Sequence, residues 1–272
     1  ALSTEGLFTL ASPTPFVFLV PGLALVVVLG VVERRAWQPL LSPLLFRSRA
    51  FVAANMAQLL EGSALVIAMV TVLLMANTVM GKDPFTGAMW LLRMTVAIPV
   101  GALVGGRLLT IMGIRPVAVI GLAMTAFGLF WASTWELTVG EPWLTLTLAT
   151  AGLGFGLNNT PIMIRALRSA SEGYQATAAS LVIVSRMVGM ALGLAALSAW
   201  GVEHFQVLTA GLETPLPAPG EAVEELQARF ATYNERLIDA GLSLFQTFLR
   251  VAGAVALIAI LPVLFMGSDD RE

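Results

Sequence analysis

Seven long apolar stretches fill this chain of 272 residues. They lie at 14–32, 51–77, 85–106, 116–134, 143–164, 174–200 and 243–266. A helix needs about 20 apolar residues to cross the roughly 30 Å hydrocarbon core of a bilayer. The pattern therefore predicts seven transmembrane helices and an all-α membrane protein.

Composition agrees with this class and excludes others. Hydrophobic residues make up 57% of the chain and charged residues 12%, whereas soluble domains carry about 25% charged residues. No basic patch of the kind that binds nucleic acid is present. There is no cysteine, and His204 is the only histidine, so we expect no metal and no other cofactor. The H-E-x-x-H and P-loop motifs are missing as well, and the chain is not predicted to be an enzyme.

Basic residues occupy every second gap between the apolar stretches. One set of gaps and the C-terminal tail hold nine of them, namely Arg34, Arg35, Arg47, Arg49, Arg107, Arg115, Arg165, Arg168 and Arg271. The alternate gaps hold only Lys82, Arg229 and Arg236. Cytoplasmic loops carry the Lys/Arg excess. The chain is therefore expected to be a multi-pass protein of the cell (inner) membrane, with its N-terminus outside and its C-terminus cytoplasmic.

The gap at 33–50 marks a boundary between two parts of the chain. It mixes arginines with Trp37 and several leucines, and its prolines interrupt any long helix. Such a segment is typical of an amphipathic connector in the headgroup region. We expect 1–50 to contribute one spanning helix plus this connector, and 51–272 to form a six-helix bundle.

The longest gap, 201–242, is predicted to carry a helix of its own outside the membrane. Its apolar residues recur at steps of three and four, which describes one helical face: Val223, Leu226, Phe230, Tyr233 and Leu237. This outer loop helix is expected near 221–240, with Gly241 as its C-terminal stop.

Four charged residues fall inside predicted spans, where each costs about 2.5–3.5 kcal/mol if unpaired at the helix centre. They are Glu61, Arg93, Arg186 and Arg250. Arg250 lies about two turns from the outer end of its span, and its side chain is expected to reach the interface. The other three are expected to face a bundle interior or a water-filled cavity.

Glu61 belongs to a polar stripe, because Asn55, Gln58 and Glu61 follow one another at steps of three. One interpretation is structural: hydrogen bonds between helices, with Glu61 paired to Arg186 or to Arg93. The other is functional: a cavity wall that binds substrate, or a carboxyl group that takes up and releases a proton.

The fifth apolar stretch combines small residues with a proline. Gly152 and Gly156 are spaced for close approach of two helices. Pro161 removes a backbone donor within the membrane, which predicts a bend or an unwound turn. Asn158 and Asn159 lie beside it and are further candidates for a cavity wall.

Three segments resemble the major facilitator superfamily, and more closely the C-terminal half of its fourteen-helix drug:proton antiporter branch. They are PLLFRSRAFVAANMAQLLEGSAL, GALVGGRLLTIMGIRP and GLGFGLNNTPIMIRALRSASEGYQATAASLVIVSRMVGMALGLA. The resemblance implies that the first span closes an extra central helix pair and that the other six form the C-terminal bundle. One departure is Thr110, which stands where the inner-loop signature of the family has an aspartate.

The function implied by the resemblance is secondary active transport, in the form of proton-coupled export of amphipathic small molecules (multidrug efflux type). Transport of a defined metabolite in another branch, or a role as a non-transporting membrane scaffold or partner subunit, are the alternatives. The chain begins Ala1-Leu2-Ser3 without Met, which together with the odd number of spans suggests a fragment. The expected partners are the lipid bilayer, the small-molecule substrate, the proton and a missing N-terminal transporter half.

Overall fold

The computed structural model describes residues 43–171, 173–212, 215–216 and 223–266. Long helices account for most of these residues, and no strand occurs among them. The all-α membrane class predicted from the sequence is thereby confirmed. The predicted span at 14–32, most of the connector at 33–50 and the C-terminal tail lie outside the described residues.

Nine helical elements follow one another along the described part of the chain. They are α2 (Pro43–Arg47), α3 (Arg49–Leu74), the π-helix η2 (Met75–Val79), α4 (Pro84–Met112), α5 (Ile114–Ala132), α6 (Trp143–Arg168), α7 (Gln175–Thr209), α8 (Val223–Ile258) and α9 (Ile260–Leu264).

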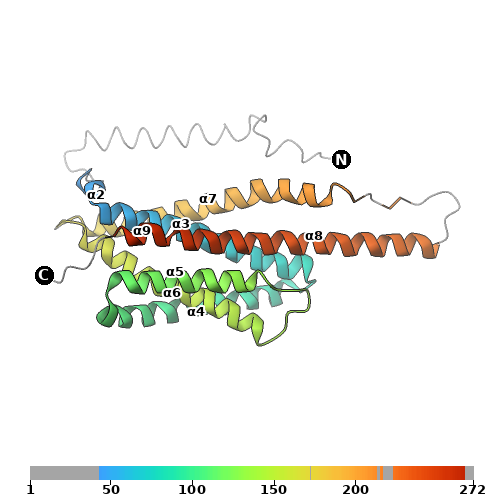
Figure 1. The fold of residues 1–272 in the computed structure, drawn as a ribbon, viewed down its shortest axis with the longest axis horizontal. Helices are drawn as coiled ribbons and strands as arrows, with labels where there is room; N and C mark the ends of the chain where they lie inside the picture. The colour runs from blue at the N-terminus through green and yellow to red at the C-terminus, as the bar shows by residue number, and fades with distance from the viewer. Residues whose placement is uncertain (1–42, 172, 213–214, 217–222, 267–272) are drawn as a thin grey trace.

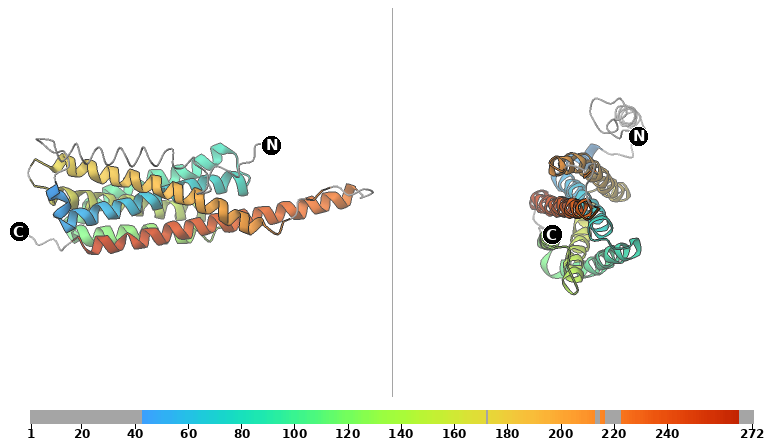
Figure 2. Two further views of the ribbon diagram at one scale, coloured as in Figure 1. Left: turned by 90° about the horizontal axis from the view of Figure 1, so that it is seen from above. Right: turned by 90° about the vertical axis from the view of Figure 1, so that its right-hand side faces the viewer.

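Four helices form the centre of the bundle. Helices α3, α6, α5 and α8 each pack against the next and close a ring, while α4 packs chiefly on α6, and α7 chiefly on α3. Figures 1 and 2 show the long helices running side by side along one axis. Only 22% of the most apolar segment of α4 and of α7 is buried within the bundle, against 56% for α3. Helices α4 and α7 therefore present broad apolar faces to their surroundings.

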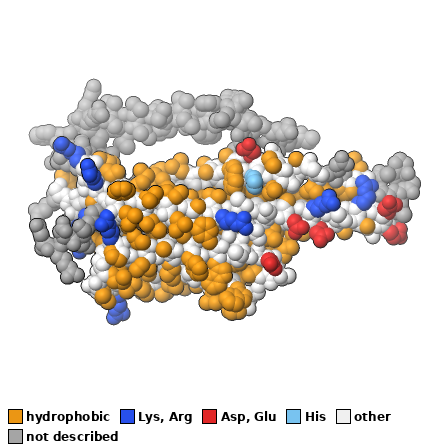
Figure 3. Space-filling view, viewed as in Figure 1, with side chains coloured by type: hydrophobic (Ala, Val, Ile, Leu, Met, Phe, Trp, Pro, Cys, Tyr) orange, Lys and Arg blue, Asp and Glu red, His pale blue; other side chains and the backbone are white. Residues whose placement is uncertain are grey.

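Within the described part of the chain, five helices are long and apolar enough to cross a membrane: α3 with η2, α4, α5, α7, and α8 with α9. Helix α6 coincides with the predicted span at 143–164 and is 26 residues long, but it is less apolar because it carries Gly, Thr and Asn residues along its length. Its neighbours α4 and α5 both pack closely on it. The space-filling view shows Lys and Arg side chains gathered at the left-hand end of the bundle, with others near its middle and on the extension at the opposite end (Figure 3).

The outer loop helix and the last span are a single helix. Helix α8 runs without a break from Val223 to Ile258, and its first part extends beyond the other helices (Figures 1 and 2). The expected stop at Gly241 is therefore wrong. Gly241 is buried, and a Cβ added there would lie 2.9 Å from Cγ2 of Val79. A glycine inside a helix costs only about 1 kcal/mol, so close contact with η2 at this position outweighs its tendency to end helices.

Glycines set the distance between α4 and α6. A Cβ on Gly101, Gly105, Gly152 or Gly156 would strike backbone atoms of the opposite helix, so the two backbones are in direct contact. Pro161 lies inside the same α6, which continues to Arg168. Of the two alternatives expected at Pro161, the unwound turn is wrong, because the helix keeps its winding there; the bend stays a prediction.

Candidate functional site

The polar stripe of α3 faces two other helices. Asn55 accepts a hydrogen bond from Oγ of Ser185 on α7 at 2.8 Å. Gln58 donates from Nε2 to Oδ1 of Asn159 on α6 at 3.3 Å. One turn further, Oε1 of Glu61 lies 3.6 Å from Nη2 of Arg186 on α7. The stripe is thus a line of three contacts between helices, and we treat it with its partners as the candidate site.

Close contact between α3 and α7 brings the charged pair together. A Cβ on Gly62 would strike the backbone carbonyl of Arg186, and one on Gly189 would strike that of Leu59. Ser63 adds a bond between the helices, because its hydroxyl donates to the carbonyl of Gly189 at 2.8 Å. Small residues at these positions let the backbones touch, and this holds the Glu61 and Arg186 side chains at the contact.

Glu61 is the most deeply buried charged group of the site. Its exposure is 0% and that of Gln58 is 1%, whereas the Arg186 side chain is 22% exposed. Neither carboxyl oxygen of Glu61 hydrogen-bonds to a described residue, and 3.6 Å is too long for a hydrogen bond. A buried carboxyl group held by one arginine alone has two accessible states: an ion pair, or a neutral acid carrying a proton.

The two neighbouring asparagines point in different directions. Asn159 is partly exposed and meets α3, which agrees with a place on a cavity wall. Asn158 is fully buried and abuts α5, where a Cβ on Gly121 would lie 2.8 Å from its Cβ. In this structure Asn158 belongs to the contact between α5 and α6, and the expectation that it lines a cavity stays a prediction.

Buried polar groups divide the apolar core into two parts. One apolar cluster occupies the half of the bundle that contains Trp90 and Trp135, and a second occupies the half that contains Leu45 and Met266. Four buried polar residues lie between the two clusters along their helices: Gln58, Glu61, Thr125 and Asn158. Each has at least one side-chain polar atom that hydrogen-bonds to no described residue. The candidate site thus lies at the middle level of the bundle.

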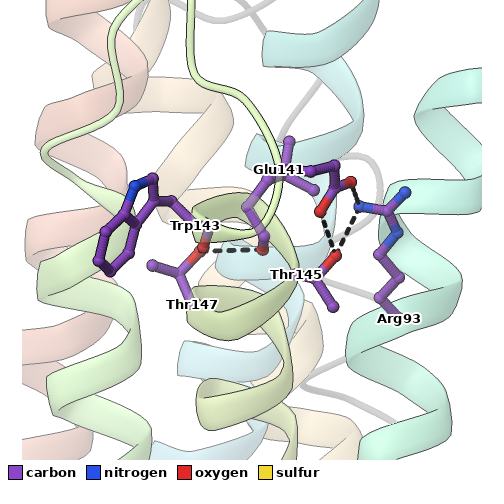
Figure 4. A network of polar contacts seen from close by, with 6 residues as sticks. Arg93, Glu141, Trp143, Thr145 and Thr147 are labelled. Atoms are coloured by element: carbon purple, nitrogen blue, oxygen red, sulfur yellow. Dashed lines mark hydrogen bonds and ion pairs between the residues drawn. The ribbon is translucent and has the colours of Figure 1, made fainter.

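Arg93 belongs to a different site, near the beginning of α6. Its Nη1 donates to Oε1 of Glu141 and, at 2.8 Å, to Oγ1 of Thr145, while that hydroxyl donates to Oε2 of Glu141 at 2.6 Å. Figure 4 shows the arginine of α4 reaching toward these two side chains. The hydrogen bond from Thr145, together with the hydrogen bond and charge of Arg93, holds the pKa of Glu141 below its ordinary value. Of the two arginines considered as partners of Glu61, the structure selects Arg186.

Arg250 is the last of the four charged residues that fall inside predicted spans, and the expectation that its side chain reaches the interface stays a prediction. It is exposed on α8, four residues from Gln246, whose amide donates to the carbonyl of Trp135 in the loop that follows α5. Arg250 is therefore about one helical turn along α8 from the residue that contacts this loop. An arginine side chain is long enough to reach a polar region over such a distance.

Several residues of these sites were not singled out from the sequence. Ser185 directly precedes Arg186, and a serine so close to a charge inside a span is a usable signal. Glu141 and Thr145 gave none, because Glu141 lies in a gap, and a loop acid is ordinarily solvated. Among the described residues, no group of three or more His, Asp or Glu side chains gathers in a way that suits a metal ion.

Comparison with known proteins yields a consistent set of relatives. No protein-family model matches the chain. It is 34% identical over 253 residues to a protein of Mycolicibacterium smegmatis named triacylglyceride transporter, covering 88% of this chain and 45% of that protein. The identity is also 34% to triacylglyceride transporters of Mycolicibacterium hassiacum (88% of this chain and 47% of the relative) and Mycobacterium tuberculosis (75% and 41%). The chain is a multi-helix membrane protein similar to named transporters, and it spans about half the length of the relatives it matches.

Proposed function

We propose that this chain is the C-terminal bundle of a proton-coupled secondary transporter of the major facilitator type, which exports apolar or amphipathic molecules. The substrate class that we favour is neutral lipid, because the relatives are named triacylglyceride transporters. Multidrug efflux is the second candidate, on the resemblance of the three segments quoted above to drug:proton antiporters.

One observation carries the proposal: a fully buried carboxyl group faces a partly exposed arginine inside the bundle. Glu61 and Arg186 belong to different helices and meet at 3.6 Å. Intramembrane ionisable groups are costly and mark proton or ion pathways. Protonation of Glu61 removes the attraction that holds this pair, so proton binding changes the free energy of the contact between α3 and α7. A coupling mechanism needs such a link between proton occupancy and helix contact.

The other half of the transport machinery is assigned to the part of the relatives that this chain does not cover. Alternating access requires one bundle to move against another around a central site. We propose the exposed faces of α4 and α7 as the surfaces that meet the second bundle, because these two helices are the least buried of the described spans. On α7 that face includes Ile183, Val184 and Met187, whose exposure is 47%, 50% and 63%. In the same proposal the arginine-rich end of the bundle is cytoplasmic.

The test is transport by the full-length protein in proteoliposomes carrying an imposed pH gradient. A fluorescent triacylglyceride and a fluorescent cationic drug serve as alternative substrates. Glu61→Gln is expected to fold and to abolish gradient-driven movement of one of them, whereas the control Arg250→Gln, at an exposed arginine, retains it. Undiminished transport by Glu61→Gln contradicts the role of Glu61. Transport of the drug but not of the lipid transfers the proposal to multidrug efflux.

A further inference from the structure

Three aromatic rings and the only histidine of the chain form a continuous series of contacts from α7 to α8. The imidazole of His204 stacks on the indole of Trp200, with ring centroids 4.9 Å apart and an interplanar angle of 17°. The same indole meets the ring of Phe248 on α8 at 5.6 Å, and Phe248 meets Phe245 at 6.1 Å. Trp200 is therefore the link between His204 and a pair of phenylalanines that are buried in the core.

Two features of the sequence bring these rings together. Trp200 and His204 are four residues apart on α7, so their side chains lie on the same face of the helix. Gly201 lets the ring of α8 approach, because a Cβ on this glycine would lie 2.7 Å from Cζ of Phe248. Phe248 is 4% exposed and Trp200 is 38% exposed. The indole thus has one buried neighbour, Phe248, and one neighbour that is itself partly exposed, His204.

The surroundings of His204 hold few charged groups. The helices that pack against α7 are α3, α6 and α8. Their stretches in this half of the bundle carry no charged residue, namely 62–79 of α3 and η2, 143–164 of α6 and 240–249 of α8. The charged residues that border this region are Glu203 on α7 itself and Asp239 and Arg250 on α8, all of them exposed. Among the described residues, no carboxylate forms an ion pair with His204.

The position of His204 along α7 gives water access to its ring. It lies about 44 Å along the helix axis from Gln175, at 1.5 Å per residue, whereas the hydrocarbon core of a bilayer is about 30 Å thick. A helix that enters the membrane in its first turns has therefore left the hydrocarbon region before it reaches His204. Glu203 and Gln206, on either side, are exposed as well.

The stack changes its character when the imidazole takes up a proton. Histidine is the side chain whose charge ordinarily changes between pH 5 and pH 8. A cation within about 6 Å of an indole ring, over its face, is attracted by the electrons of that ring, and the stack of His204 on Trp200 has this geometry. Protonation therefore adds an attraction that the neutral stack lacks, and it breaks no ion pair within the described part of the chain.

We propose that the stack of His204 on Trp200 is a pH-sensitive contact that fixes α7 against α8 when the imidazole is protonated. Both rings belong to α7, so the added attraction reaches α8 through the indole: it holds Trp200 in the rotamer in which the indole meets Phe248. At alkaline pH the neutral stack holds that rotamer less firmly, and the contact between the helices loosens. The stack is formed by residues other than Glu61 and Arg186 and does not depend on the proposed transport function.

The test is a distance measurement between spin labels on α7 and α8 of the full-length protein in lipid vesicles. Nitroxides are attached at Val207→Cys and Ile238→Cys, two exposed positions of a chain that has no cysteine. Lowering the pH from about 8 to about 5 is expected to reduce the population with separated labels roughly two- to five-fold, the factor that corresponds to one cation–π contact at an exposed site. A distance distribution that is the same at both pH values overturns the proposal.

Variants of the labelled protein assign the response to the stack. His204→Gln and Trp200→Leu are each expected to abolish it, because one removes the group that takes up the proton and the other removes the ring that attracts the cation. Glu203→Gln is the matched control: it changes the titratable neighbour of His204, leaves both rings in place and is expected to keep the response. Loss of the response in Glu203→Gln, or its persistence in His204→Gln, contradicts the assignment.

Tryptophan fluorescence gives a second readout that needs no label. A protonated imidazole in contact with an indole quenches its emission, so the part of the emission that His204→Gln alters is expected to fall in acid in the parent and in Glu203→Gln. Emission of the parent that follows the same pH profile as that of His204→Gln overturns the proposal. The comparison of the labelled parent at the two pH values decides the question even where one of the substitutions prevents folding.

Discussion

The Glu61–Arg186 pair allows a quantitative test of what holds α3 against α7. Two opposite unit charges 3.6 Å apart attract by roughly 4–5 kcal/mol at an effective dielectric constant of about 20. Desolvation of the buried carboxyl group offsets part of this attraction. Removing one partner of a buried pair costs about 3–5 kcal/mol, and we expect the lower end, about 3 kcal/mol, because the Arg186 side chain keeps 22% exposure.

The perturbation is a double-mutant cycle of Glu61→Gln, Arg186→Gln and the combined variant in the full-length protein. At roughly 2–4 °C per kcal/mol for a domain of this size, each single variant is expected to lower Tm by about 6–12 °C if the pair is ionised. The combined variant is expected to recover most of the loss, because no unpaired charge remains. Arg250→Gln is the control, since that arginine is exposed.

Thermal unfolding in detergent and gradient-driven transport are measured on the same preparations. If Glu61 is held as a neutral acid in the resting state, Glu61→Gln leaves Tm unchanged and abolishes transport. If the pair is purely structural, Tm falls and the combined variant restores transport. A Tm within about 2 °C of the parent together with normal transport refutes the reasoning, because it would mean that the pair contributes neither to stability nor to coupling.

Three further predictions concern the surroundings of the site. The pKa of Glu141 lies below its ordinary value of 4.5, so the stability that the ionised carboxylate contributes is fully present above pH 4.5 and is lost as the pH falls through the lower pKa of the folded protein. Glu141→Gln should therefore lower Tm at neutral pH and remove the loss of Tm seen in acid. An acid profile of Tm that is unchanged in the variant would contradict this. An impermeant thiol reagent applied to intact cells should label Cys at Ala210 and not at Ser48, and the reverse pattern would overturn the proposed orientation. Gly156→Ala should reduce the yield of folded protein, because the added Cβ meets the backbone of α4. Gly106→Ala is the control: its Cβ meets nothing within 4 Å, and its yield should match or exceed that of the parent. Equal yields of the two variants would refute the close helix contact.

The spans and the polar stripe were predictable because each depends on spacing within one helix. Asn55, Gln58 and Glu61 share a face at steps of three whatever lies opposite. The partner of Glu61 was not predictable, because two arginines on different helices were available. The choice depends on which helix packs on α3, and that order is set by contacts such as those of Gly62 and Gly189.

Other features were missed because local signals were overridden by contacts with distant residues. Gly241 was expected to end a helix, yet its burial against Val79 favours continuation of α8. Asn158 and Asn159 are adjacent in sequence, so composition treats them alike. Successive helical residues point about 100° apart, and one therefore meets α5 while the other meets α3.

Arg186 stands at the border between the buried and the exposed parts of α7. On one side the helix is fixed to α3 by backbone contact at Gly189 and by the hydrogen bond from Ser63. On the other side its apolar face is open, with Met187 63% exposed. The Glu61 side chain is fully buried, so a change at the surface of α7 acts on it only through neighbouring residues. Arg186 is its charged neighbour. In the proposed mechanism, a displacement of the open face of α7 changes the separation of the pair, and a change of protonation at Glu61 acts on α7 through the same contact. Two such effects are reciprocal by thermodynamic necessity, so under this proposal one pair of side chains links proton binding to the position of a helix.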